Sequence, residues 1–385
     1  MAVQTPKQAL VFGASGISGW SIVKECLSYP SPNAFSRVIG LSNRPLTEGV
    51  SMLPIENKKW ELHSGVDLER GADVVAEKLK AIGGIEGISH VYFTSYTAHG
   101  SDHQTLKQAN VTILLNAVQA VEKLCPNLQF WTLQTGGKAY GVEFVNKGID
   151  YNPPLKETMP RIPEPYASNI FYYAQYDTME RLSEGKRWKF CEIRPDAIVG
   201  FVPQNNAMNI AQALGLFLAM YKSVEGSGSE VPFPGNEAAY KELHTDTSQD
   251  ILARFHIFAS FHADAVAGRA FNVADGDVVN WEEIWPGVCS WFGLKGVGPD
   301  QSRSTGAKWV QEHKGQWNAW VKEHGLKEGA LEATSWDFMS VLMGIPFDRH
   351  YDLSACRQVG FNETVSTVKG YTLAFERMKH AKIIP

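Results

Sequence analysis

The chain has 385 residues, 44% of them hydrophobic, which is enough for one large domain with a lobe or for two domains. Its 36 basic and 41 acidic side chains are mixed along the chain and leave a formal net charge of −5. Because there is no basic stripe, neither nucleic acid nor an anionic membrane surface is an expected partner.

The cysteines and the N-terminus indicate a reducing compartment. The five cysteines are far apart, odd in number and without a CxxC pair, so they predict neither a disulfide framework nor a zinc site, and we expect no metal. Residues 1–16 run into an apolar strand without a signal-peptide pattern, and no stretch reaches the ~18 apolar residues of a membrane span. We therefore expect a cytoplasmic protein that does not enter a membrane.

The first 140 residues alternate short apolar runs with longer helical patterns, as in a parallel sheet covered on both faces. The clearest helix spans 102–124, where an apolar stripe recurs near the 3.6-residue period. The predicted strands are 8–14, 37–42, 60–66, 90–95, 129–135 and 190–195. This pattern predicts an α/β fold, a doubly wound parallel sheet of the Rossmann type that occupies residues 1–200 and binds a dinucleotide.

The pattern changes after about residue 200. Residues 201–385 are rich in helical patterns, are interrupted by the turn-forming stretch 225–236, and carry most of the tryptophans. We predict that they form a mostly helical substrate-binding region. One apolar run, at about 269–275, is expected to return to the sheet as a further strand.

Three glycines, Gly13, Gly16 and Gly19, follow the first strand with GxxGxxG spacing and directly precede a helix. Glycines allow a sharp turn and let a pyrophosphate approach the N–H groups at the helix N-terminus, whose dipole favours an anion. A lone glycine triplet could form only a tight turn, but its place at the first βα turn favours dinucleotide binding. Ser15 and Ser18 add hydroxyls to the same turn.

The end of the second strand indicates which dinucleotide binds, because a carboxylate there binds a ribose 2′-hydroxyl and a basic residue accepts a 2′-phosphate. The chain has Ser42, Asn43 and Arg44 at this point, which favours NADPH. Arg44 could instead be a solvated surface charge. After the third strand, Asp67 and Leu68 are placed to meet the adenine, although Asp67 could also cap a helix.

The segment Ser168–Asp177, SNIFYYAQYD, holds three tyrosines at the start of a predicted helix. Many reductases on this scaffold carry a lysine four residues after the catalytic tyrosine, so that the ammonium lowers the pKa of the phenol. None of the 13 tyrosines has such a lysine. The candidate is Lys138, which follows a Gly-Gly turn at the strand edge where ligands of such sheets bind. Taken alone, Lys138 could also be an exposed loop residue.

Several longer segments occur in a recognisable order: VFGASGISG, HVYFTSY, LQTGGKAYG, NIFYYAQYD, IRPDAIVGF, FNVADGDVVNW and a terminal AKIIP. With these segments the chain resembles, over nearly its whole length, the progesterone 5β-reductase and iridoid synthase family of atypical short-chain dehydrogenases. The resemblance implies that Tyr172 is the catalytic tyrosine and that Lys138 is its lysine, displaced from the helix to the end of a strand.

The resemblance also implies a set of cofactor contacts. The chain departs from the family pattern at Asn43 and Tyr96, and at the inserted Ile170 and the terminal Asp177 of the tyrosine segment. The contacts are Ser15, Gly16 and Ile17 at the pyrophosphate, Arg44 at the 2′-phosphate, Asp67 and Leu68 at the adenine, and Ser95, Tyr96, Gln134 and Ile198 near the nicotinamide. Asn43 replaces the first of two family arginines, so the preference for NADPH over NADH is expected to be weaker. Tyr96 replaces a family tryptophan, which changes the width and polarity of the pocket.

The implied reaction is the NADPH-dependent reduction of an activated C=C bond in a small apolar enone or enal. Tyr172 would donate a hydrogen bond to the carbonyl oxygen, and Lys138 would make that donor more acidic. One alternative is a carbonyl reductase or epimerase of the extended short-chain dehydrogenase type, against which the missing Tyr-x-x-x-Lys argues. A second is a non-catalytic NADPH-binding regulator, which would not need Tyr172. The chain could assemble as a homodimer.

Overall fold

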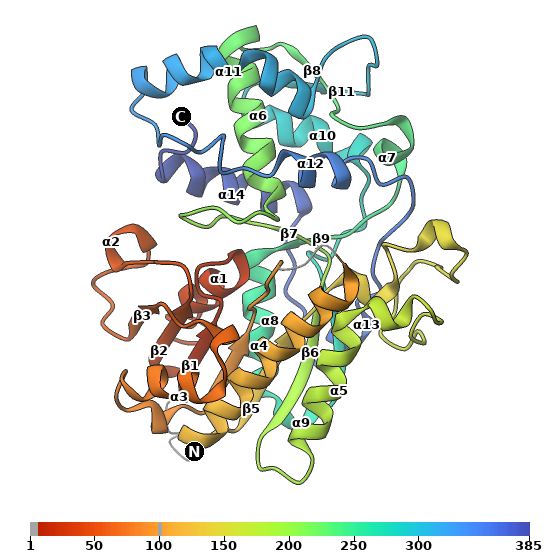
Figure 1. The fold of residues 1–385 in the computed structure, drawn as a ribbon. Coiled ribbons are helices and arrows are strands. Elements are labelled where there is room, and N and C mark those ends of the chain that lie inside the picture. Colours follow the sequence, from red (N-terminus) through yellow and green to blue (C-terminus); the bar gives the residue numbers. More distant parts are fainter. Residues whose placement is uncertain (1–6, 99–101) are drawn as a thin grey trace. The chain divides into compact units, whose positions relative to one another are not determined.

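The computed structural model describes residues 7–98 and 102–385, which fold into two compact units (Figure 1). Unit 1 comprises the residues up to Asp196, together with Leu252–Val273 and Asp352–Asn362. Unit 2 comprises Ala197–Ile251, Ala274–Tyr351 and Glu363–Pro385. The chain thus returns to unit 1 twice, whereas the sequence analysis divides it after residue 200 and predicts one return, the strand at about 269–275.

Unit 1 is built on a parallel sheet that has seven strands in the described part of the chain. The strands lie in the order β10 (Ala270–Val273), β6 (Lys189–Pro195), β5 (Phe130–Gln134), β4 (His90–Phe93), β1 (Lys7–Phe12), β2 (Phe35–Ser42) and β3 (Trp60–Ser64). All six neighbouring pairs are parallel. This arrangement confirms the predicted doubly wound α/β fold, and β10 pairs with β6 at one edge.

Alternate residues of the strands pack on opposite faces of the sheet, because side chains in a strand point to the two faces in turn. Val91, Phe93 and Trp131 belong to a buried cluster that also contains the apolar residues of α3 (Ala72–Lys80) and α4 (His103–Leu124). On the other face, the Tyr92 hydroxyl lies 2.8 Å from Ser260 Oγ in α8 (Gln249–Phe261). Both faces are therefore covered, which explains why the strands read as nearly continuous apolar runs.

Further helices complete the two layers of unit 1 (Figure 1). They are α1 (Ile17–Glu25), α2 (Glu48–Ser51), α5 (Phe171–Ser183), α9 (Ala263–Val266) and α13 (Ser354–Gln358). The predicted helix at 102–124 is α4, and Asp102 caps it by accepting hydrogen bonds from the N–H groups of Gln104 and Thr105.

Unit 2 is mostly helical. Its elements are α6 (Ile210–Glu225), α7 (Glu237–Lys241), α10 (Trp281–Ser290), α11 (Gly306–Glu323), α12 (Trp336–Leu342) and α14 (Thr367–His380). The first three turns of α6 are buried on every side, as expected for a helix that is apolar all round. Trp309 of α11 packs on it, with its ring 4.9 Å from that of Tyr221.

Two small parallel sheets in unit 2 are missing from the sequence analysis. They pair β7 (Ala197–Val199) with β9 (Asp246–Ser248), and β8 (Glu230–Pro232) with β11 (Lys295–Val297). Each strand has three residues, which is too short to show an alternating pattern.

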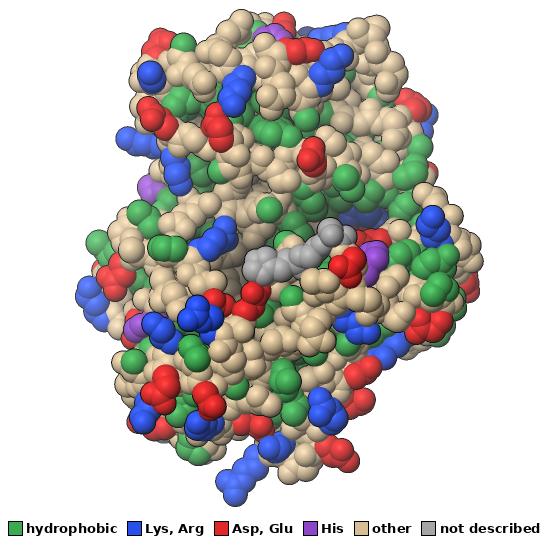
Figure 2. Space-filling model, in the orientation of Figure 1, with side chains coloured by type: hydrophobic (Ala, Val, Ile, Leu, Met, Phe, Trp, Pro, Cys, Tyr) green, Lys and Arg blue, Asp and Glu red, His purple; other side chains and the backbone are tan. Residues whose placement is uncertain are grey.

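The surface matches the mixed charge of the sequence. Figure 2 shows basic and acidic side chains interspersed over one face of the molecule, without a large patch of either sign. None of the helices within residues 7–98 and 102–385 is both long and apolar enough to cross a membrane.

Candidate active site

The glycine-rich turn joins β1 to α1 with almost no space for side chains. A Cβ atom added at Gly19 would lie 2.2 Å from the carbonyl oxygen of Gly13. Gly13 itself has φ +91°, and a Cβ there would lie 2.8 Å from Thr94 Oγ1. Both positions therefore require glycine, which brings the chain tightly from the strand into the helix. The result is a cradle at the α1 N-terminus of the kind that holds the pyrophosphate of a dinucleotide.

The end of β2 lies beside this turn. The Leu41 carbonyl accepts hydrogen bonds from the N–H groups of Gly13 and Ala14, at 3.0 and 2.9 Å. The exposed Arg44 points its guanidinium at the turn, and Nη2 donates to the Ser15 carbonyl at 3.3 Å. A cation next to the anion cradle fits the 2′-phosphate of NADPH. Asn43 is also exposed and is free to face a ligand from the same loop.

Asp67 and Leu68 follow β3 and have structural roles in this state. The Asp67 carboxylate accepts a hydrogen bond from the Glu69 N–H at 3.0 Å and so caps the 3₁₀ helix Leu68–Arg70. The Leu68 side chain is buried, and its carbonyl accepts a hydrogen bond from Asn116. The capping role that the sequence left open is therefore present, and a contact with adenine stays a prediction.

The loop after β4 carries Ser95 and Tyr96. Two hydrogen bonds hold it, since the Asn110 amide of α4 donates to the Thr97 carbonyl and accepts from the Thr97 N–H. Tyr96 is 41% exposed, and its ring centroid lies 6.0 Å from that of Phe171, which in turn lies 4.4 Å from the ring of Tyr172. A row of aromatic rings thus connects the end of β4 to the start of α5.

The three tyrosines of α5 differ in what their hydroxyls bind. The Tyr173 hydroxyl donates to the Ala139 carbonyl at 2.6 Å and accepts from the Ile162 N–H. The Tyr176 hydroxyl donates to the Gly268 carbonyl at 2.7 Å. The Tyr172 hydroxyl makes no hydrogen bond with any residue of the described ranges. Of the three, only Tyr172 is uncommitted and able to serve a ligand.

Tyr172 lies against the Gly-Gly turn that follows β5. A Cβ added at Gly136 would be 3.7 Å from the Tyr172 hydroxyl and 3.3 Å from the Pro195 carbonyl oxygen at the end of β6. Burial raises the pKa of Tyr172, and the nearby Tyr96, Glu143 and Glu192 raise it further. The phenol is therefore neutral at physiological pH and carries the proton that a hydrogen-bond donor needs.

Lys138 sits in the 3₁₀ helix Gly137–Tyr140, directly after the same turn. Its ammonium donates to Glu143 Oε1 at 2.7 Å, and the two side chains are 34% and 35% exposed. The sequence analysis missed Glu143, because a carboxylate five residues from a lysine in a loop carries no signal of its own. The expected lowering of the Tyr172 pKa is not seen in this state, since burial dominates.

A buried polar network anchors the turn that carries Lys138. Glu192 of β6 accepts hydrogen bonds from Thr135 Oγ1 at 2.6 Å and from Arg194 Nη2 at 2.7 Å. Arg194 Nη1 also donates to the Tyr140 hydroxyl, which donates to Asn272 Oδ1 of β10. Glu192 and Arg194 are two residues apart on one strand and so share a face of the sheet, a spacing that is visible in the sequence.

The last two predicted contacts lie in different units. Gln134 is the final residue of β5, and its amide donates to Ser18 Oγ of α1 at 3.0 Å. The structure therefore brings together a predicted nicotinamide contact and the glycine-rich turn. Ile198 lies in β7 of unit 2, and its contact with a cofactor stays a prediction.

A seven-stranded parallel sheet with a glycine cradle at its first turn and a tyrosine and lysine at its carboxyl edge defines an oxidoreductase of the short-chain dehydrogenase/reductase class. A solved structure with this fold is the GDP-mannoheptose C4 reductase of Campylobacter jejuni with NADP bound. It matches with a TM-score of 0.62 over 98% of this chain and 100% of its own, at 14% identity. Residues 9–385 match the model of the PRISE-like Rossmann-fold domain, and the chain belongs to this family.

Two relatives align over nearly the full length. A short chain dehydrogenase, sirQ, of Leptosphaeria maculans is 37% identical over 383 residues, which is 98% of this chain and 97% of the relative. A 3-oxo-Delta(4,5)-steroid 5-beta-reductase of Arabidopsis thaliana is 27% identical over 383 residues, 98% of this chain and 93% of the relative. These matches confirm the family resemblance that the sequence motifs predicted.

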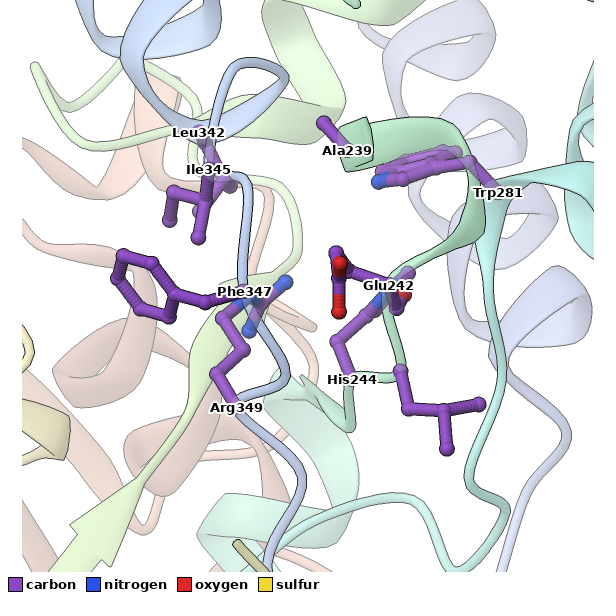
Figure 3. Close-up of a pocket in the computed structure, with 9 residues that line it drawn as sticks. Ala239, Glu242, His244, Trp281, Leu342, Ile345, Phe347 and Arg349 are labelled. Carbon is purple, nitrogen blue, oxygen red and sulfur yellow. The ribbon is translucent and has the colours of Figure 1, made fainter. Parts of the chain in front are cut away.

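Unit 2 contains a small pocket next to α7 (Figure 3). Its lining residues are Ala239, Glu242, Leu243, His244, Trp281, Leu342, Ile345, Phe347 and Arg349. Water can fill about 10 Å³ of it, which is roughly the space of one molecule. The pocket in this state is therefore too small for a steroid-sized ligand.

Glu242 in this pocket has a raised pKa because it lies beside Asp348. A hydrogen bond with Asp348, followed by partial burial, raises the pKa of Glu242 from 4.5 to about 7. Between these two pH values the folded chain holds a proton that the unfolded chain has released. Folding stability from this pair is therefore complete below pH 4.5 and is lost as the pH rises towards 7.

We expect Glu242→Gln to remove this pH dependence, because an amide donates to Asp348 at every pH. The urea midpoint of the variant should match that of the wild type at pH 4.5 and exceed it at pH 8. Asp348→Asn should also abolish the trend, since its carbonyl oxygen can still accept the hydrogen bond from the Leu243 N–H. Equal differences between variant and wild type at both pH values would contradict the raised pKa of Glu242.

Proposed function

We propose that this oxidoreductase reduces the activated C=C bond of a small apolar enone or enal, with NADPH as the cofactor. The observation that carries the proposal is the uncommitted Tyr172 hydroxyl at the Gly-Gly turn that bears Lys138. The name of the Arabidopsis relative supports it, because a 3-oxo steroid with a Δ4,5 double bond is a conjugated ketone.

The residues at the edge of the sheet fit NADPH. The glycine cradle, with Gly16, Ser15 and Ile17 at the α1 N-terminus, would hold the pyrophosphate. Arg44 would bind the 2′-phosphate from the end of β2. The remaining contacts, as the family resemblance implies, would be Asp67 and Leu68 at the adenine, and Ser95, Tyr96, Gln134 and Ile198 near the nicotinamide.

In the proposed reaction, bound NADPH supplies the hydride that adds to the β-carbon of the substrate. The electrons of the double bond move towards the carbonyl oxygen, where negative charge accumulates, and water supplies the proton that the α-carbon takes up. Tyr172 stabilises this oxygen by donating a hydrogen bond. Its raised pKa keeps the phenol protonated, so Tyr172 acts as a neutral donor and loses no proton.

Lys138 would stabilise the charge on the same oxygen and bind the cofactor ribose. Glu143 holds the ammonium at the turn through the 2.7 Å ion pair, and a ribose hydroxyl could accept a second of its three N–H groups. The positive charge would also favour the developing oxyanion at short range. Lys138 thus contributes electrostatic stabilisation to the transition state and orientation to the cofactor.

Carbonyl reduction and epimerisation occur on the same fold, and the tyrosines argue against them here. Enzymes of that type carry a lysine four residues after the catalytic tyrosine. In this chain that position is Tyr176, whose hydroxyl donates to the Gly268 carbonyl. A regulator that only binds NADPH would turn over no substrate. The identity of the product therefore distinguishes these alternative functions from C=C reduction.

We expect the purified protein to oxidise NADPH when it is offered small enones and enals, and to release the saturated carbonyl compound. Tyr172→Phe should lower kcat by about 10²–10³, because one oxyanion donor supplies about 2.7–4 kcal/mol. The loss of NADPH absorbance measures kcat, and mass spectrometry identifies the product. Tyr173→Phe is the matched control, since it loses only a structural hydroxyl. An allylic alcohol as the product, or an active Tyr172→Phe, would refute the proposed chemistry.

The Arg44 contact predicts a difference between the two nicotinamide cofactors. Arg44→Ala should weaken NADPH binding at least tenfold, because a charge-assisted hydrogen bond contributes about 1.5–3 kcal/mol. The Kd for NADH should stay within a factor of about two. Fluorescence titration measures both dissociation constants. Arg187→Ala is the control, because Arg187 is exposed and precedes β6, so it lies at the amino ends of the strands, away from the site. A wild-type protein that binds both cofactors equally would remove Arg44 from the site.

Lys138→Met should both weaken NADPH binding and slow turnover, because it removes the proposed ribose contact and the charge near the oxyanion. We expect about a tenfold loss in each, from one charge-assisted hydrogen bond. Lys147→Met, which removes an exposed lysine at the end of the 3₁₀ helix Val145–Lys147, is the control. If the two variants behave alike, Lys138 is a surface residue.

A further inference from the structure

A row of four buried or half-buried side chains runs along one face of the sheet, from the middle of β5 to the glycine-rich turn. Thr132 Oγ1 of β5 lies 2.7 Å from His256 Nδ1 of α8. His256 Nε2 lies 3.2 Å from Gln134 Oε1, and Gln134 Nε2 lies 3.0 Å from Ser18 Oγ in the first turn of α1. Thr132 and Gln134 are two residues apart on β5, so both face α1 and α8.

The direction of the hydrogen bonds follows from Thr132. Its side chain is fully buried, and within the described residues its hydroxyl is hydrogen-bonded to His256 Nδ1. If Nδ1 carried the proton, the buried hydroxyl hydrogen of Thr132 would have no acceptor, which costs about 1–3 kcal/mol. Thr132 therefore donates, and His256 Nδ1 accepts.

The rest of the row follows from this first bond. Burial lowers the pKa of His256 to about 3, so the ring is neutral and carries one proton, which must be on Nε2. Nε2–H donates to the Gln134 carbonyl oxygen, and this turns the Gln134 amide nitrogen towards Ser18. Ser18 then accepts with a lone pair and keeps its own O–H.

We propose that His256 is a positioning residue for the cofactor site, and that its Nε2–H tautomer leaves the Ser18 O–H and the second Gln134 N–H free to donate to NADPH. The opposite tautomer would turn the amide over and draw the Ser18 O–H into a bond with Gln134. The inference rests on the proposed function only in placing NADPH at the glycine-rich turn. It does not depend on the identity of the substrate.

The tautomer can be measured in the cofactor-free protein. Long-range ¹H–¹⁵N NMR spectra distinguish Nε2–H from Nδ1–H, and the signals of His256 are those that disappear in His256→Gln. We expect Nε2–H in the wild type. Thr132→Val should remove the bond that selects this tautomer without a large change of volume. A wild-type His256 with its proton on Nδ1, or a charged ring at neutral pH, would overturn the proposal.

Ligand binding gives the second test. His256→Phe should weaken NADPH binding about fivefold to tenfold, because two hydrogen bonds lose their direction. Binding of 2′,5′-ADP, which carries the 2′-phosphate but no nicotinamide, should change less than twofold. His256→Gln should recover most of the NADPH affinity, because its side-chain N–H can replace Nε2–H. Equal losses for NADPH and 2′,5′-ADP, or no loss for either, would overturn the positioning role.

These measurements use no enone, so they separate the inference from the proposed reaction. If the protein binds NADPH with the expected pattern among the variants but reduces no enone, the proposed reaction fails and the role of His256 stands. If His256→Phe does not fold, which a urea titration shows, Thr132→Val provides the same comparison of NADPH with 2′,5′-ADP. An unchanged NADPH affinity in folded Thr132→Val, together with an Nδ1–H tautomer, would overturn the proposal.

Discussion

The parallel direction of all the strands in the described sheet is the constraint on which the site depends. Because the strands of unit 1 run the same way, the loops that follow them emerge at one edge. The glycine turn after β1, Arg44 after β2 and the Gly-Gly turn after β5 are separated by long stretches of sequence, yet the sheet collects them. The helix N-terminus at Gly16 adds a favourable dipole to the same edge.

Competition for hydrogen bonds decides which groups at this edge can act on a ligand. Tyr173 and Tyr176 have the same chemistry as Tyr172, but backbone carbonyls hold their hydroxyls. Asp67 is likewise engaged as a helix cap. A buried polar group without such a partner is costly, so an uncommitted hydroxyl beside a ligand-binding edge indicates a group that is kept for a ligand.

Two buried polar networks support the residues that are proposed to bind the ligand. Glu192 and Arg194 bind Thr135 and Tyr140 on either side of the Lys138 turn. On the other face of the sheet from Glu192 and Arg194, His256 orients the amide of Gln134. In the interior, hydrogen bonds are strong and their directions are well defined, so such networks can fix the orientation of a side chain better than solvent-exposed contacts can.

The sequence by itself determined the features that depend on local spacing. These are the alternation that predicts the parallel sheet, the glycine triplet, the basic end of β2 and, through the family motifs, the choice of Tyr172 and Lys138. Only the tertiary structure decided which hydroxyl is free, that Glu143 pairs with Lys138, and that His256 in α8 lies beneath Gln134. Those facts depend on segments that meet only when the chain folds. The apolar run at 269–275 predicted the return of β10 to the sheet, whereas nothing in the spacing predicted the second return at Asp352–Asn362. The spacing of residues along the chain determines which helix, strand or turn a segment can form, whereas tertiary packing determines which other segments it contacts.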